Sequence, residues 1–262
     1  MRIIDSGTGP PLIVIPGVQG RWEWMRPAIR ELRKRCRTIT YTLCGDSGSG
    51  LTLDPQLGFD NYTRQLDAVF EETGLEKAAL CGVSYGGFIA LRYAARHPDR
   101  VSSLILSSSP APGWTPNERQ QRQIARPWRS APAFALGAPL RLWPEIQAAF
   151  DTWPQRVLFM ARHGLRVVAA PMKPALMASR VTLQQRIDFF PDCATISVPT
   201  LVLSGEDALD FVVPAEVTRR YEKLISGARY ARMERSGHIG LITRPAQFAD
   251  ILARFVASAE KN

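Results

Sequence analysis

The chain has 262 residues, of which 45% are hydrophobic and 22% are charged. These proportions are close to those of globular domains and exclude disordered and fibrous classes of protein. The length is that of one large α/β domain, which can bury a core and hold a site at its centre. The net charge of +9 raises the question of an anionic partner, because basic surfaces attract nucleic acids and acidic membranes.

Most of the excess of positive over negative charge lies in one segment. Residues 110–196 contain eleven Arg or Lys and five Asp or Glu, so this segment carries about two thirds of the net charge of +9. Within 119–129 and 156–186 the basic residues recur every three to seven residues, a spacing typical of the polar face of amphipathic helices, and they form no consecutive basic run. We therefore expect a solvated helix face and no nucleic-acid partner. A weak attraction for anionic substrates or membrane surfaces is the alternative.

The apolar runs and the cysteines bear on location. No stretch approaches the roughly 18 consecutive apolar residues of a membrane-spanning helix, and the first seventeen residues hold only the short run 12–15. We predict neither a signal peptide nor an integral membrane segment. The four cysteines are scattered without a Cys-x-x-Cys pair, which indicates neither a zinc site nor a disulfide framework and favours a cytoplasmic location.

Short aliphatic and β-branched clusters alternate with longer segments of helical period along most of the chain. Strands are predicted over 11–16, 37–43, 78–83, 101–107, 200–204 and 228–233. Helices are predicted over 22–35, 61–73, 85–96, 214–225 and 245–257. This alternation predicts an α/β fold with a mostly parallel central sheet and helices on both faces.

The alternation stops between residues 110 and 196, where several prolines divide the segment into short amphipathic helices and no strand is evident. Four of the six tryptophans fall there. We predict a helical lid inserted at 110–196 into a core domain formed by 1–109 and 197–262. A lid needs an apolar underside facing a pocket and a charged face toward water. The alternative is an ordinary helical layer packed on the sheet.

The first candidate for chemistry is Gly82-Val-Ser84-Tyr-Gly86, which matches Gly-x-Ser-x-Gly. An apolar strand precedes this motif and a helical pattern follows it, which is the strand, sharp turn and helix of a nucleophile elbow. The two glycines are required because larger side chains would collide with the neighbouring helix or strand. Ser84 is therefore the candidate nucleophile. The backbone NH of Tyr85, at the start of the helix, is a candidate oxyanion donor.

A serine hydroxyl needs an adjacent base, usually a histidine that is oriented by a carboxylate. The chain has three histidines. His97 lies where the helix after the elbow ends, and His163 lies within the predicted lid. His238 follows the last predicted strand, as the order serine, acid, histidine requires, so we assign it as the base. Histidines this far apart also indicate no metal cluster.

The acid is expected after the strand 200–204, where the loop 205–214 offers Glu206, Asp207 and Asp210. At this point the sequence resembles the α/β-hydrolase superfamily over nearly the whole chain. The resemblance rests on Pro16-Gly17, Gly82 to Gly87, Gly205 to Pro214 and Ser236-Gly-His238.

Members of that family often read Gly-x-x-Asp-x-x-Val-Pro at the acid loop. Asp210-Phe-Val-Val-Pro214 matches the second half, while two extra residues put Ala208 where counting from Gly205 would place the acid. We prefer Asp210, with Asp207 and Glu206 as alternatives. A second departure is Pro16-Gly17 in place of the family's His-Gly. Because the loop provides a backbone NH, Val18 remains the expected second oxyanion donor.

Several other classes are disfavoured by residue type. Relatives that act on haloalkanes or epoxides carry Asp at the elbow, where this chain has Ser84. No Gly-x-Gly-x-x-Gly follows a strand, so we expect no nicotinamide or flavin cofactor. The glycine-rich stretch 45–50 lacks the Lys-Ser/Thr of a phosphate-binding P-loop, and we interpret it as a mobile loop beside the active site.

The resemblance implies acyl transfer to water, most often from carboxylic esters, through an acyl-enzyme intermediate on Ser84. The apolar content of the predicted lid favours a small-molecule substrate with a hydrophobic acyl or alkyl group; it includes Trp114, Trp128, Trp143 and Trp153. Alternatives with the same triad are thioester hydrolysis, carbon–carbon bond hydrolysis and acyl transfer to another acceptor. A ligand-binding protein without activity is a further alternative, and the oligomeric state is left open.

Overall fold

The computed structural model describes residues 1–260 and contains one seven-stranded sheet, in the order β1-β3-β2-β4-β5-β6-β7. The strands are β1 (Ile3–Ser6), β2 (Pro11–Ile15), β3 (Arg37–Tyr41), β4 (Ala78–Val83), β5 (Val101–Ser107), β6 (Thr200–Ser204) and β7 (Arg229–Arg232). All neighbouring strands are parallel except β1, which is antiparallel to β3. The six predicted strands are confirmed. The edge strand β1 was missed because its four residues, Ile-Ile-Asp-Ser, are too few to show a period.

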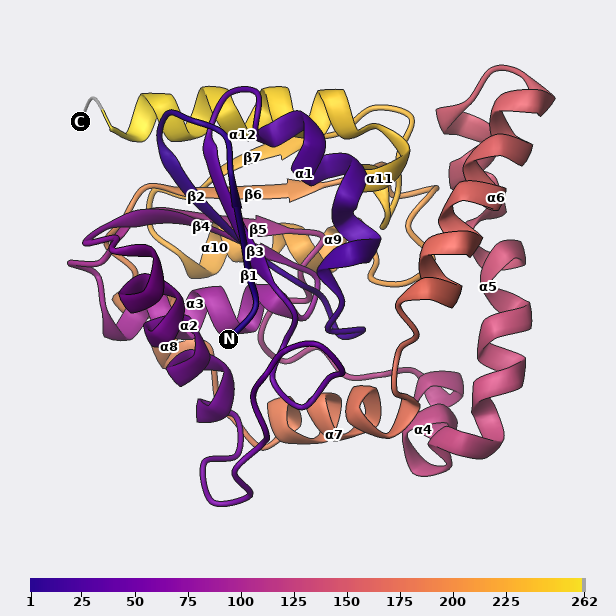
Figure 1. Cartoon of the computed structure of the whole chain (residues 1–262), viewed down its shortest axis with the longest axis horizontal. Helices are drawn as coiled ribbons and strands as arrows, with labels where there is room; N and C mark the ends of the chain where they lie inside the picture. Colours follow the sequence, from indigo (N-terminus) through magenta and orange to yellow (C-terminus); the bar gives the residue numbers. More distant parts are fainter. Residues whose placement is uncertain (261–262) are drawn as a thin grey trace.

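Helices cover both faces of the sheet, as predicted. One face carries η1 (Trp22–Met25), α1 (Arg26–Leu32), α11 (Gly240–Thr243) and α12 (Pro245–Ala259). The other face carries α2 (Asp60–Thr73), α3 (Gly86–Arg96), α8 (Phe190–Thr195), α9 (Ala215–Arg219) and α10 (Tyr221–Leu224). Figure 1 shows the sheet edge-on between these two layers.

The core consists of two apolar layers separated by the sheet. Ile13 and Ile15 of β2 belong to the layer under α2 and α3, whereas Leu12 and Val14 belong to the layer under α1 and α12. This division follows from the two-residue period of a strand. Every residue of β4 is buried, so the strand that ends at the elbow is supported on both sides.

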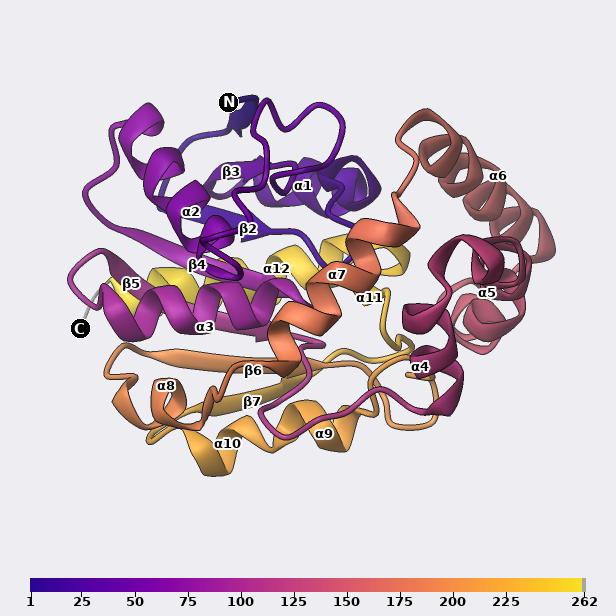
Figure 2. The ribbon, with the colours of Figure 1, turned by 90° about the horizontal axis from the view of Figure 1, so that it is seen from below.

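Four further helices lie between β5 and β6: α4 (Glu118–Ala125), α5 (Pro127–Ala149), α6 (Trp153–Ala169) and α7 (Pro174–Gln185). We call residues 118–185 the inserted segment. Both views place α4, α5 and α6 together at one side of the molecule, beside the carboxyl ends of the strands (Figures 1 and 2). The last helix of the predicted lid, α8, packs instead against α3, where Arg92 lies 3.2 Å from Asp192.

The prediction that prolines divide this segment into short helices is wrong for α5. This helix has 23 residues and continues through Pro132, Pro139 and Pro144. Each proline removes one backbone donor, but Pro132 and Pro139 are exposed, so water can solvate the carbonyl groups that lose a partner. Within residues 1–260 we find no helix with the length and apolar character needed to cross a membrane.

Candidate active site

The nucleophile elbow lies at the centre of the carboxyl edge of the sheet. Ser84 follows β4 with a φ of 51°, a left-handed conformation that is rare for residues other than glycine. A side chain at Gly82 would collide with the backbone of Gly86, and one at Gly86 would collide with the carbonyl of Ile15. The Ser84 amide donates to the carbonyl of Ser107 at 2.8 Å. The expected strained turn with obligatory glycines is therefore present.

Ser84, His238 and Asp210 lie in hydrogen-bonding contact. Nε2 of His238 is 3.2 Å from Oγ of Ser84, and Nδ1 is 3.1 Å from Oδ2 of Asp210. The second carboxylate oxygen of Asp210 accepts hydrogen bonds from the amides of Val212 and Val213, both at 2.9 Å. Both oxygens of this buried carboxylate are thus hydrogen-bonded, which holds it toward the imidazole.

The other two candidate acids do not reach His238. The side chain of Asp207 is exposed. Glu206 accepts a hydrogen bond from the amide of Arg235 at 2.6 Å and so braces the strand-to-loop connection. The two extra residues in this loop are accommodated before Asp210, which keeps its spacing to Pro214.

Charges around His238 set its protonation. Burial alone would lower the pKa of His238, but the charge and hydrogen bond of Asp210, together with the charge of Glu145, raise that pKa above its ordinary value. The positive form of the imidazole is therefore favoured by two carboxylates. This is the form that a base has after it accepts a proton from a serine.

The two expected oxyanion donors flank Ser84. A side chain added at Gly17 would lie 3.5 Å from Cβ of Ser84, so the loop after β2 touches the elbow. Within residues 1–260, the amides of Val18 and Tyr85 have no hydrogen-bond acceptor. Both residues line a cavity that also contains Ser84. Unpaired amides beside a nucleophile can receive a developing negative charge.

Arg180, on α7, is a residue that sequence reasoning did not single out. Its side chain is fully buried and forms an ion pair with Asp46. One Nη atom also donates to the carbonyl of Val18 at 2.9 Å, and another donates to the carbonyl of Cys44 at 3.4 Å. The inserted segment is thereby connected to the Val18 loop and to the glycine-rich stretch 45–50.

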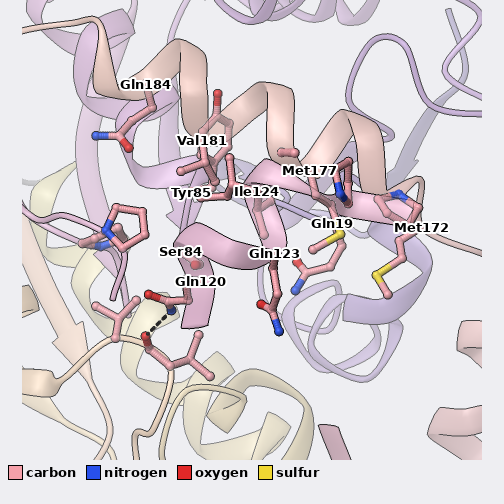
Figure 3. A pocket seen from close by; sticks show the side chains of 18 of the residues that line it. Gln19, Ser84, Tyr85, Gln120, Gln123, Ile124, Met172, Met177, Val181 and Gln184 are labelled. Atoms are coloured by element: carbon pink, nitrogen blue, oxygen red, sulfur yellow. Dashed lines mark hydrogen bonds between the residues drawn. The ribbon is translucent and has the colours of Figure 1, made fainter. Parts of the chain in front are cut away.

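Two cavities meet at Ser84. The first, which we call the narrow cavity, has a volume of about 170 Å³ and contains Val18 and Tyr85 but not His238. The second, the wide cavity, has a volume of about 520 Å³ and contains His238. Figure 3 shows the narrow cavity, with Met177 and Val181 of α7 and Ile124 of α4 around the elbow. Glutamines supply most of its polar groups; they are Gln19, Gln120, Gln123 and Gln184.

Only one of the four tryptophans of the predicted lid lines these cavities. Trp114 borders the narrow cavity, whereas Trp128 and Trp153 are 69% and 60% exposed and Trp143 packs against Trp153 at 5.7 Å. The expectation that all four tryptophans face the pocket is therefore wrong for Trp128, Trp143 and Trp153. The apolar walls come mainly from methionine, proline and aliphatic side chains.

The remaining histidines occupy other positions. His97 ends α3 and packs against the ring of Tyr93 at 4.6 Å. His163 lines the wide cavity, stacked on Phe159 at 5.9 Å, and burial together with Arg166 lowers its pKa to about 4. Among residues 1–260, no group of three or more His, Cys, Asp or Glu side chains is arranged to hold a metal ion.

Comparison with known proteins agrees with this architecture. The model of the family described as the alpha/beta hydrolase fold matches residues 10–245, and the chain therefore belongs to the α/β-hydrolase fold family. It is 30% identical to the 2-hydroxymuconate semialdehyde hydrolase of Pseudomonas sp. strain CF600, over 98% of this chain and 90% of the relative. The expected fold class and family are confirmed, and the related proteins are hydrolases.

Solved structures share the fold at lower identity. An esterase from Thermogutta terrifontis superposes with a TM-score of 0.80 and 23% identity, covering 98% of this chain and 93% of the esterase. The enol-lactonase from Burkholderia xenovorans LB400 superposes with a TM-score of 0.78 and 22% identity, covering 98% and 96%. At these identities the likeness concerns the fold.

Proposed function

We propose that this protein is a serine hydrolase that cleaves a carboxylic ester, or a related acyl compound, with Ser84 as nucleophile, His238 as base and Asp210 as the orienting acid. The observation that carries the proposal is the continuous contact from Asp210 through His238 to Ser84, at 3.1 and 3.2 Å. An activated serine needs this arrangement of base and carboxylate.

The proposed reaction proceeds through an acyl-enzyme. Oγ of Ser84 bonds to the acyl carbon while its proton passes to Nε2 of His238, and the carbonyl electron pair moves onto an oxygen held by the amides of Val18 and Tyr85. The bond to the leaving group then breaks, and His238 gives its proton to that group. A water molecule repeats the sequence, which releases the acid and restores Ser84.

The two cavities support an assignment of the substrate's halves. A leaving group must lie near His238 to receive its proton. His238 lines the wide cavity but not the narrow one. The acyl group is then held in the narrow cavity, whose volume of about 170 Å³ is close to that of an apolar cavity known to hold benzene. We therefore propose a small-molecule substrate with a short hydrophobic acyl group and a larger leaving group.

The inserted segment is proposed to act as a lid over this site, within the predicted span 110–196. Residues of both α4 and α7 line the narrow cavity, and residues of α5 and α6 line the wide one. We also propose a cytoplasmic location, since the four cysteines are unpaired thiols, which suits a reducing compartment.

A second candidate reaction is hydrolysis of a carbon–carbon bond with the same residues. It is favoured by the 30% identity to a 2-hydroxymuconate semialdehyde hydrolase. The compound in that relative's name is the direct probe for this candidate. If the protein turns over this compound with a higher kcat/KM than any ester, carbon–carbon bond hydrolysis is the main activity and ester hydrolysis is not.

The test uses nitrophenyl esters with acyl chains of increasing length, together with a fluorophosphonate label and mass spectrometry. We expect turnover that falls for long acyl chains, loss of turnover in Ser84→Ala, and one labelled residue, Ser84. A label on another serine, or unchanged turnover in Ser84→Ala, contradicts the proposal. Ligand-induced thermal stabilisation without turnover or label would instead indicate a binding protein.

A further inference from the structure

Glu145 of α5 is buried beside the loop that carries His238, although 93 residues separate the two in the chain. We propose that Glu145 is a positioning residue, which holds the loop 234–244 so that His238 meets Ser84. This inference rests on the proposed function of His238. It assigns to the inserted segment a part in building the catalytic site, in addition to covering it.

The contacts of Glu145 lie directly next to His238. The side chain is 1% exposed. One carboxylate oxygen accepts a hydrogen bond from the amide of Ile239 at 3.0 Å, and the other accepts one from the hydroxyl of Thr243 at 3.1 Å. The Ile239 amide belongs to the peptide group that follows His238. A fixed acceptor at this amide therefore restrains the backbone from which the imidazole projects.

Other polar contacts of the loop with α5, or with Asp151 two residues beyond its end, are longer or more exposed. Arg235 pairs with Asp151, whose side chain is 74% exposed, and it also donates to the carbonyl of Ala148 at 2.7 Å. Arg244 donates to the carbonyl of Ala149 at 3.4 Å. Exposed ion pairs contribute little to stability, and Glu145 is the most deeply buried of these polar contacts.

A buried carboxylate is expensive unless it is hydrogen-bonded. The pKa of Glu145 is raised, because burial outweighs the opposing effects of the neighbouring amides of Ile239 and Gly237, the charge of His238 and the hydrogen bond from Thr243. Hydrogen bonds to an ionised group are stronger than neutral ones. A carboxylate at this position thus forms stronger hydrogen bonds to the loop than an amide of the same shape would.

The charge also acts on His238. Asp210, on the loop after β6, and Glu145, on α5, are the two carboxylates that raise the pKa of His238. The other charged or titratable side chains on the walls of the wide cavity are basic: Arg21, Arg119, Arg141 and His163. Removal of the negative charge of Glu145 therefore lowers the pKa of His238.

The test is Glu145→Gln, which preserves the shape but removes the charge. We expect kcat on a nitrophenyl ester to fall by up to about 100-fold, the loss that a misplacement of about 1 Å can cause, with KM unchanged. The midpoint of the rise of kcat/KM with pH moves to lower pH. Asp151→Asn, at the same end of α5, is the matched control and should leave kcat, KM and the midpoint unchanged.

A purely structural role would lower the melting temperature of Glu145→Gln and leave the pH midpoint in place, and that result overturns the proposal. Should Glu145→Gln not fold, Thr243→Val removes one of the two hydrogen bonds and keeps the charge. We then expect kcat to fall with KM unchanged, and Thr243→Ser to restore it. An unchanged kcat in a folded Thr243→Val protein also overturns the proposal.

Titration of the His238 ring followed by nitrogen NMR separates this inference from the proposed function, because it requires no turnover. If no ester is cleaved and Ser84 takes no label, the proposed function fails. The pKa of His238 should still fall in Glu145→Gln. An identical His238 titration in wild type and Glu145→Gln contradicts the positioning role even where esters are cleaved.

Discussion

The sheet-bearing core and the inserted segment differ in how they are held together. In the core, the strands beside the elbow bury nearly all their apolar side chains in two layers. In the inserted segment, α5 and α6 expose large apolar side chains, and Leu136, Leu140 and Leu165 are 78%, 79% and 70% exposed. Figure 1 shows these helices at the side of the molecule, beyond the carboxyl ends of the strands.

Two buried polar residues connect the inserted segment to the loops of the candidate site. Glu145, near the end of α5, contacts the His238 loop, and Arg180, on α7, contacts the Val18 loop. The comparison teaches that the core is held by apolar packing, whereas these two buried polar residues connect the segment to the site. Changes at the polar contacts should therefore affect catalysis and local order.

The largest expected effect concerns the acid. We expect Asp210→Asn to reduce kcat by about 10⁴-fold, as the equivalent change does in the serine protease that serves as the reference case, because the imidazole then takes the wrong tautomer. Circular dichroism should show an unchanged fold. Asp207→Asn is the matched control and should retain most activity, since its side chain is exposed. The reverse result would identify Asp207 as the acid.

The next effect tests the connection through α7. Arg180→Met leaves Asp46 buried without its partner, which should cost about 3–5 kcal/mol of unfolding free energy. Urea unfolding measures this loss. The double change Arg180→Met with Asp46→Leu should recover a large part of it, because no isolated charge then remains. An equal loss in the single and double variants would show that the ion pair is not the cause.

A pair of leucines sharpens the contrast between the regions. Leu80→Ala, at a fully buried position in β4, should destabilise the protein by about 2–5 kcal/mol. Leu140→Ala, on the exposed side of α5, should change stability by less than about 0.5 kcal/mol. Both values come from urea unfolding of the same preparation. Similar losses at the two positions would mean that the exposed face of α5 is covered in solution.

The smallest effect is a displacement of the pH profile. Since the pKa of His238 is raised, kcat/KM should rise with a midpoint above the ordinary value of about 6.5. Glu145→Gln should bring the midpoint down. The raised pKa also stabilises the folded protein at low pH. This stabilisation is fully present below the pKa of the histidine in the unfolded chain, and it is lost as the pH rises through the pKa of His238 in the folded protein. A midpoint below 6.5 in wild type contradicts this expectation.

Local sequence patterns determined much of the fold. The strands were predictable because a buried strand produces a short aliphatic run, and the elbow because Gly82 and Gly86 are required by contacts within a few residues or with the adjacent strand. His238 was predictable because the order of strand, loop and helix places it at the same sheet edge as Ser84. These requirements act over short stretches of chain or through a regular topology.

Only the tertiary structure decided which carboxylate meets His238 and which residues of the inserted segment reach the site. The side chains of Glu206, Asp207 and Asp210 differ in burial and in the group toward which they point. Neither difference produces a periodic pattern in the sequence. Glu145 sits on a helix far from His238 along the chain, so its role depends on packing between distant segments. The exposed tryptophans show the same limit, because helical spacing predicts an apolar stripe without specifying whether it faces the cavity or the solvent.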